Sequence, residues 1–136
     1  MTSVQELAKG LARRGETIPG LRCYPVMHPK PEPPCLCVAG PVRWTYDETM
    51  EGYWRPVFEC WLFVNPADLF RAQETLHAYI APSGAKSLPA AIYGDPTLGG
   101  LTAETRVLGG SRPPGEVETA GGRLLGCALE VEVLAM

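Results

Sequence analysis

No apolar run in the sequence approaches the roughly 20 residues that a membrane-spanning helix needs. The N-terminus also lacks the basic stretch followed by an apolar one that is typical of a secretion signal. Both absences argue against a membrane protein or an exported one. The sequence therefore predicts a soluble product that stays inside the cell where it is made.

Positive charge is in short supply, since 12 Lys and Arg stand against 15 Asp and Glu, for a net charge of −3. The basic residues are also scattered along the chain. Nonspecific affinity for nucleic acid comes largely from neutralising phosphates. This composition therefore argues against a protein that binds nucleic acid by sequence or by charge alone.

The number of cysteines is also not even, as it would be if all of them formed disulfides. The chain has five, and an odd count without a secretion signal leaves at least one thiol unpaired. A reduced, cytosolic state is the simplest expectation, and a disulfide framework is not. The five are Cys23, Cys35, Cys37, Cys60 and Cys127.

Recognisable signatures of metal binding are absent as well. Cys35 and Cys37 come nearest, because thiolates bind zinc tightly, but a zinc site needs about four ligands. His28 and His77 are the two histidines, and neither stands at a known ligand spacing. We favour two small apolar side chains on one face of a strand over a metal site.

Catalytic motifs are equally hard to find. Cys60 or Cys127 could in principle pair with His77 as nucleophile and base, but no motif supports either pair. The glycine pairs do not form a phosphate-binding loop. The sequence thus predicts no catalytic, cofactor-binding or metal-binding residues, and no enzymatic activity.

What the chain does have is the composition of a globular protein, with 46% hydrophobic and 20% charged residues spread along its length. Its 136 residues lie near the commonest size of one domain. A second domain would have too few residues left to bury a core. We expect a single domain over residues 1–136.

The first segment predicts a helix. Ser3 followed by Glu6 forms a capping box, and an apolar stripe recurs at helical spacing through Leu11. The helix should end near Gly15. Five prolines in residues 25–34 then predict an extended, irregular segment on the surface.

Three β-prone runs follow, at residues 35–39, 42–46 and 54–64. Residues 47–53, which hold three acids and a glycine, predict a long protruding hairpin loop. Both alternate sets of residues 54–64 are mostly apolar, as in a strand that is buried on both faces.

A second helix is expected from Asn65, as N-cap, with Pro66 at its first position and Asp68 in its first turn. Its predicted apolar stripe runs through Leu69, Ala72, Leu76 and Ile80, with Tyr79 at the edge and His77 beyond it. A shorter helix is expected at residues 86–93, before a loop at residues 95–100.

Two closing strands are expected at residues 101–108 and 123–134, joined by the Gly-rich and Pro-rich segment 109–122. The element order predicts an α+β fold, in which two main helices and a short third helix pack on an antiparallel or mixed β-sheet.

Aromatic residues crowd around the predicted hairpin. Aromatics are enriched at interface centres, which favours an interaction surface beside the loop over a core role for Tyr53 and Trp54. For the aromatics deeper in the strand, Phe58, Trp61 and Phe63, a core cluster is an equally good explanation. The crowded set comprises Trp44, Tyr46, Tyr53, Trp54, Phe58, Trp61 and Phe63.

Several short sequence segments, taken together and in their order along the chain, resemble the tail terminator family of long-tailed, non-contractile bacteriophages. The strongest is Asp95-Pro96-Thr97-Leu98-Gly99-Gly100 before two closing strands. The others are Thr17-Ile18-Pro19-Gly20-Leu21-Arg22, Pro33-Pro34 before a β-prone run, Tyr46-Asp47-Glu48-Thr49, Ala72-Gln73 with Leu76 and Tyr79, and Ser83-Gly84 before Lys86-Ser87-Leu88. Cys35 and Cys37, and the segment 109–122, depart from the pattern.

The resemblance implies a tail-terminator-like α+β fold and a structural virion protein of the tail and neck, assembled in the host cytoplasm. Such a protein caps the tail tube as a ring of six copies, stops polymerisation and joins the head-side neck. Its partners are further copies of itself, the tail tube protein and a neck connector, with DNA passing through the ring. Neither a membrane nor a specific nucleic-acid sequence is an expected partner.

Candidate contacts to neighbouring subunits and to the tube lie in two regions, the hairpin at residues 46–54 and the segment 109–122. The residues are Tyr46, Asp47, Glu48, Thr49, Met50, Glu51, Tyr53, Trp54 and Arg112. Two alternatives stay open at this point. One is a head-completion or neck connector protein at the same joint, and the other is a small cytosolic thiol or metal protein that uses Cys35 and Cys37.

Overall fold

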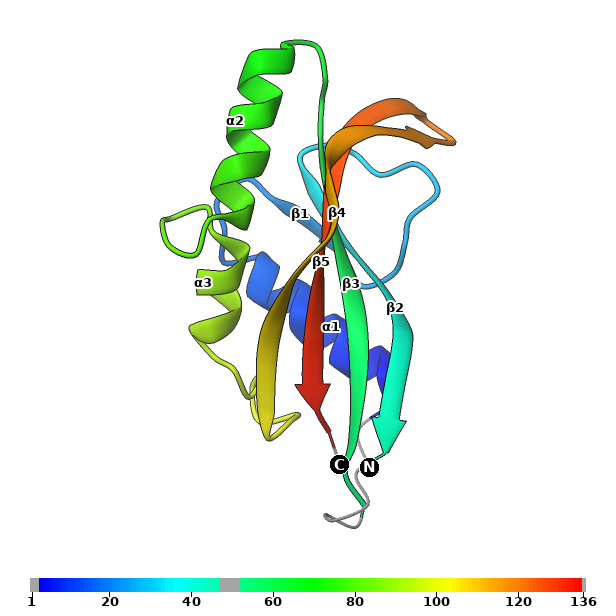
Figure 1. The fold of residues 1–136 in the computed structure, drawn as a ribbon, viewed down its shortest axis with the longest axis vertical. Coiled ribbons are helices and arrows are strands. Elements are labelled where there is room, and N and C mark those ends of the chain that lie inside the picture. The colour runs from blue at the N-terminus through cyan, green and yellow to red at the C-terminus, as the bar shows by residue number, and fades with distance from the viewer. Residues whose placement is uncertain (1–2, 47–51, 136) are drawn as a thin grey trace.

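The computed structural model describes residues 3–46 and 52–135. Within these residues, three helices pack on one face of a five-stranded mixed sheet, which confirms the predicted α+β fold (Figure 1). The elements in chain order are α1 (Val4–Gly15), β1 (Arg22–Tyr24), β2 (Cys35–Tyr46), β3 (Trp54–Val64), α2 (Leu69–Ile80), α3 (Leu88–Tyr93), β4 (Glu104–Thr119) and β5 (Gly122–Leu134). No helix in the described part of the chain is long and apolar enough to cross a membrane.

The strand order in the sheet is β1-β2-β3-β5-β4. Short β1 runs parallel to β2, and the other neighbours are antiparallel. The long strands β3 and β5 therefore lie in the middle, where both of their edges are paired. The sheet has β4 along one outer edge and, beyond the short β1, β2 along the other.

Helix α1 forms as the sequence predicts. Ser3 caps it, because its hydroxyl accepts a hydrogen bond from the N–H of Glu6 at 3.2 Å. At its other end, Gly15 packs tightly on the sheet, where an added Cβ would lie 2.5 Å from Leu36 Cδ2 and 2.8 Å from Cys23 Sγ. A glycine at this position lets the end of the helix approach β1 and β2 closely.

The predicted strands at residues 35–39 and 42–46 are one strand, β2, and the prediction of two was wrong. Their pairing with β3 continues through an irregularity between Ala39 and Arg43. Gly40 absorbs it with a φ of 117°, in the left-handed region that favours glycine. Gly40-Pro41 therefore shifts the register of the strand without ending it.

Helix α2 begins later than predicted. Its N-cap is Asp68, whose carboxylate accepts from the N–H of Arg71 at 3.2 Å, whereas Asn65 caps only a preceding turn by accepting from Ala67 N–H. The stripe was also misassigned at its ends. Tyr79 is buried and Leu69 is exposed, while His77 is exposed as expected.

Segment 109–122, which we predicted as the connection between the two closing strands, is itself mostly strand. It forms the outer half of β4, which pairs with the first residues of β5 as a curved hairpin with a tight turn at residues 120–121 (Figure 1). The pairing shifts register three times between Val107 and Gly115, as expected where β-bulges bend a strand. We call this hairpin, residues 109–126, the arm.

The main core lies between the helices and one face of the sheet. On that face stand alternate residues of the central strands, such as Phe58, Leu62, Cys127 and Val131, packed with Leu11 and Leu76 from the helices. The opposite face carries no helix within the described residues, and we call it the open face. A second, smaller cluster of Cys35, Cys37 and Phe63 is buried there. Strand β3 is thus buried on both faces along much of its length, as predicted.

Candidate assembly surfaces

The first predicted contact region lies at the end of the β2–β3 hairpin. Tyr46 is 73% exposed, and its ring stacks on that of Trp54 with centroids 6.5 Å apart. Trp54 is half-buried, and its backbone exchanges two hydrogen bonds with Ala135, each 2.9 Å long. Tyr53 is half-buried too. Predicted contacts at Asp47, Glu48, Thr49, Met50 and Glu51 lie outside the described residues.

Three apolar side chains next to this end are exposed at alternate positions of β2. Val42, Trp44 and Tyr46 are 47%, 53% and 73% exposed. Trp44 lies opposite Pro56 and Tyr46 opposite Trp54 in the pairing of β2 with β3, so both stand on the face that the helices cover further along. We call these three residues the β2-edge patch.

The backbone of β2 is open along the same stretch. Strand β1 pairs with β2 only as far as Cys37, and no other described strand lies beside residues 38–46. Trp54 turns its N–H and C=O toward Ala135, so alternation along an antiparallel pair directs those of Trp44 and Tyr46 away from β3. The patch therefore combines exposed apolar side chains with an outward-facing strand edge.

Arg112, the predicted contact in the second region, lies at the other end of the sheet. Its guanidinium carbon is 5.4 Å from the centroid of the Trp61 ring, on the open face. The structure thus does not bring Arg112 together with Tyr46 and Trp54. The two predicted regions are separate surfaces.

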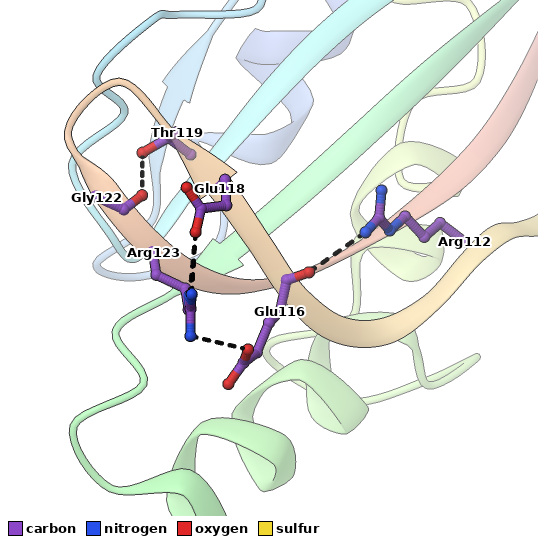
Figure 2. A network of polar contacts seen from close by, with 6 residues as sticks. All are labelled: Arg112, Glu116, Glu118, Thr119, Gly122 and Arg123. Atoms are coloured by element: carbon purple, nitrogen blue, oxygen red, sulfur yellow. Dashed lines mark hydrogen bonds and ion pairs between the residues drawn. The ribbon is translucent and has the colours of Figure 1, made fainter.

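Polar contacts link the two strands of the arm (Figure 2). Arg123 on β5 lies 3.4 Å from Glu116 and 3.1 Å from Glu118 on β4, and Arg112 donates a hydrogen bond to the Glu116 carbonyl. At the base of the arm, Glu59 accepts from the Ser111 hydroxyl at 2.9 Å and from Trp61 Nε1 at 2.7 Å. Ion pairs this exposed are individually worth little, so the contacts orient the arm more than they stabilise it.

A pocket of about 310 Å³ lies between the tip of the arm and the open face. The N–H of Ala120 donates a hydrogen bond to the carbonyl of Pro29 at 3.1 Å, which ties the arm to the proline-rich segment. The volume of the pocket is at the lower end for small-molecule sites, so the pocket has room for one or two side chains. The pocket is lined by Met27, His28, Pro29, Trp61, Phe63, Val117, Glu118, Thr119 and Ala120.

Four of the five cysteines are buried, and Cys23 is half-buried. Burial raises the pKa of Cys60 to about 12 and that of Cys127 to about 11, which keeps both thiols protonated and poorly nucleophilic at neutral pH. His77 lies exposed on α2. The geometry therefore lends no support to either cysteine as an activated nucleophile.

Cys35 and Cys37 share the open face, as their spacing predicts, and pack against Phe63. A hydrogen bond between the two thiols raises the pKa of Cys35 and lowers that of Cys37. In the described part of the chain, no group of three or more His, Cys, Asp or Glu side chains is arranged to hold a metal ion. The described geometry thus favours packing as the role of this pair.

Exposed apolar residues elsewhere were missed by sequence reasoning. Tyr93 at the end of α3 is 50% exposed, and its hydroxyl accepts a hydrogen bond from the N–H of Val107 on β4, next to Leu108, which is 41% exposed. Phe70 is 72% exposed at the start of α2, next to Leu69. Helical periodicity could have separated Phe70 from the buried stripe, but Tyr93 and Leu108 become neighbours only once the sheet order is known.

Comparison of the sequence with protein-family models and with curated proteins found no match.

Proposed function

We propose that this protein is a structural component of a bacteriophage tail, which caps the tail tube as a ring of six copies and stops its polymerisation. Its other face meets the head-side neck connector, and the ring leaves a central passage for DNA. In this proposal the protein belongs to the virion and is assembled in the host cytoplasm. The sequence segments that resemble tail terminators are the reason for choosing a phage tail as the particle.

The observation that carries an assembly role is the β2-edge patch. Val42, Trp44 and Tyr46 expose 47–73% of their surface at alternate positions of a strand whose outer edge is unpaired among the described residues. Large aromatic side chains are characteristic of interface centres. Exposed strand edges invite pairing with another chain unless something covers them. Both features favour aggregation of a monomer, and in a subunit of an assembly both can be covered by a neighbouring chain.

The arm adds a second feature that suits a structural subunit. It is a curved hairpin on the side away from α2 (Figure 1), held to the open face at Glu59 and to the proline-rich segment by the Ala120–Pro29 hydrogen bond. A ring that caps a tube uses a pair of surfaces for its neighbours and further surfaces for the tube and the neck. The separate positions of Tyr46 and Arg112 suit such a division of contacts.

The test is to mix the purified protein with tail tubes and examine the tube ends by electron microscopy, with light scattering to give the mass of the free protein. A ring at one end of each tube, and no further growth of capped tubes, is the expected result. A ring that binds the portal side of the neck and ignores tubes would identify a neck connector instead. Stoichiometric zinc by elemental analysis would favour the thiol or metal protein.

A further inference from the structure

We infer that the pocket between the tip of the arm and the open face binds an arginine side chain presented by a partner chain. The pocket is open to solvent, and its volume of about 310 Å³ has room for one or two side chains. Aromatic rings line it, and the carboxylate of Glu118 is the one charged group among the described lining residues. The inference goes beyond the proposed function and does not depend on capping.

Two stacked rings of β3 form the part of the pocket that lies on the open face. Trp61 and Phe63 have ring centroids 5.8 Å apart and ring planes inclined by 11°. The indole N–H of Trp61 donates a hydrogen bond to Glu59 Oε1 at 2.7 Å, and this carboxylate increases the electron density of the ring. Because the negative charge of an aromatic face attracts cations, the hydrogen bond makes Trp61 a better partner for a cation.

A guanidinium group already contacts this tryptophan. Arg112, at the base of the arm, has its guanidinium carbon 5.4 Å from the centroid of the Trp61 ring. Arg112 does not line the pocket, so its side chain does not fill it. The planar guanidinium stacks on aromatic faces, whereas the ammonium of lysine is a strongly hydrated point charge. The same chemistry inside the pocket favours arginine over lysine as the ligand.

Glu118 supplies negative charge on the arm side of the pocket. Arg123 donates two hydrogen bonds to Glu118, at 3.1 and 3.3 Å, and both end on Oε1 (Figure 2). Arg123 also lies 3.4 Å from Glu116, so one guanidinium pairs with two carboxylates. Oε2 of Glu118 accepts no hydrogen bond from the described part of the chain. This oxygen is available to a second guanidinium.

The remaining charges around the pocket set the expected strength of binding. Nδ1 of His28 accepts a hydrogen bond from the N–H of Lys30 at 3.0 Å, so in this arrangement the imidazole is uncharged and does not repel a cation. Arg112, Arg123 and Lys30 lie around the pocket without lining it. Their positive charge keeps the affinity for a single arginine side chain low, as suits one contact within a larger interface.

The pocket fits an arginine within a protein chain better than it fits free arginine. A free amino acid also carries an α-carboxylate, and no Lys or Arg among the described residues lines the pocket to pair with it. The carboxylate of Glu118 would repel it. Arginine is also one of the residues that most often dominate protein interfaces, where it enters pockets near the centre. The charges therefore favour a partner with an exposed arginine side chain.

Titration with N-acetyl-arginine amide tests the inference, and N-acetyl-citrulline amide is its neutral isostere. The indole N–H resonances of isotope-labelled protein are followed by NMR, with sodium chloride added to keep the ionic strength constant. Trp44 and Trp54 lie at the other end of the sheet and serve as internal references for Trp61. Free arginine is the third probe.

We expect a saturable shift of the Trp61 resonance alone, with a dissociation constant of about 1–10 mM for the arginine probe. The citrulline probe should bind about three- to tenfold more weakly, because it lacks the charge. Glu118→Gln should weaken binding of the arginine probe about threefold. Glu116→Gln is the matched control, since Glu116 also pairs with Arg123 but does not line the pocket. Both carboxylate side chains are exposed, and thermal unfolding checks that both variants are folded.

Equal binding of the arginine and citrulline probes would overturn the inference, because the pocket would then accept an uncharged ligand equally well. A Trp61 resonance that does not move would overturn it too, as would equal losses of affinity in Glu118→Gln and Glu116→Gln. Tighter binding of free arginine than of its blocked amide would overturn the partner chain as the source. No tube enters these measurements, so the capping function is tested separately and neither result decides the other.

Discussion

The guanidinium of Arg112 lies over the ring of Trp61, 5.4 Å from its centroid, and so joins the arm to the open face of the central strand β3. Arg112 also donates a hydrogen bond to the carbonyl of Glu116, within the arm itself. The cation therefore joins the arm to β3 at Trp61 and links two positions of β4 through the Glu116 carbonyl. The arm, in turn, shelters the aromatic pair of Trp61 and Phe63, whose rings stack 5.8 Å apart.

Replacing Arg112 should loosen the arm without unfolding the sheet. We expect Arg112→Ala to lower the free energy of unfolding by about 0.5–1 kcal/mol, the usual worth of an exposed cation–π contact. The free energy of unfolding of Arg112→Lys should lie between those of the wild type and Arg112→Ala, since lysine keeps the charge and loses the planar group. Urea unfolding, followed by tryptophan emission, measures both effects.

The matched control for Arg112 is Arg71→Ala. The Arg71 side chain is 84% exposed and lies 3.8 Å from Asp68, so its removal should change the free energy of unfolding by no more than about 0.5 kcal/mol. Equal effects of the two alanine variants would contradict a specific role for the Arg112–Trp61 contact.

The elements that were predictable from the sequence are those whose signals are local. The capping box of Ser3 and Glu6, followed by apolar residues at helical spacing, specifies α1 within a dozen residues. Strand β3 was predicted for a similar reason, because its continuous apolar character suits a central position. These patterns agree with the final fold and meet no competing signal.

Errors arose where two local signals compete, or where pairing decides. Asn65 and Asp68 are both good caps, and the chain uses Asn65 for a turn and Asp68 for the helix. Glycine and proline at positions 40–41 and 109–115 read as breaks between strands. In the structure β2 pairs with β3, and β4 pairs with β5, on both sides of these positions. The strands therefore continue, and the glycines and prolines only shift the register of pairing.

The candidate surfaces were only partly predictable. Crowded aromatics drew attention to Tyr46 and Trp54, which the structure stacks together at one end of the sheet. Tyr93 and Leu108 gave no such signal, because they stand 15 positions apart in the sequence and are exposed for unrelated reasons. Tyr93 reaches the N–H of Val107 because β4 is the outer strand, which local sequence does not reveal.

A charge at the centre of the β2-edge patch should separate assembly from stability. Trp44 is 53% exposed, so Trp44→Asp should lower the free energy of unfolding by only about 1 kcal/mol, which is the range of strand propensities. Docking would instead bury the new carboxylate, and we expect capped tube ends to disappear in electron micrographs. Phe70→Asp is the control, since Phe70 is 72% exposed at the start of α2, outside the β2-edge patch. Capping by Trp44→Asp at the wild-type level would rule out the patch.

Two glycines of α1 offer a matched test of helix–sheet packing. A Cβ at position 15 would lie 2.5 Å from Leu36 Cδ2, whereas at position 10 its nearest contact is 3.1 Å, to Leu98 Cβ. We expect Gly15→Ala to cost about 1–3 kcal/mol of unfolding free energy, as overpacking does. Gly10→Ala should cost less, because a smaller displacement of Leu98 relieves it and helix propensity recovers about 0.5–1 kcal/mol. Urea unfolding that ranks the two in the opposite order would contradict the close approach at Gly15.

Alkaline pH should weaken the fold through the buried thiols, of which Cys60 is the clearest case. Burial raises the pKa of Cys60 from 9.0 to about 12, and the side chain is 1% exposed. Above the ordinary pKa of 9.0 the unfolded chain releases this proton while the folded chain retains it. The stabilisation is therefore complete below that pH and is lost as the pH rises toward about 12. One such thiol contributes a slope of up to about 1.4 kcal/mol per pH unit.

Cys60→Ala should make this alkaline loss shallower, because one proton fewer distinguishes the folded from the unfolded chain. The remaining slope comes from groups with raised pKa values, such as Cys127 and Tyr79, less the opposite effect of Cys37. Val131→Ala is the matched control, since it also empties space in the main core but removes no titrating group. Urea unfolding from about pH 8 to about pH 10 should give Val131→Ala the wild-type slope at lower stability. If Cys60→Ala keeps the wild-type slope as well, a group other than this thiol governs the alkaline loss.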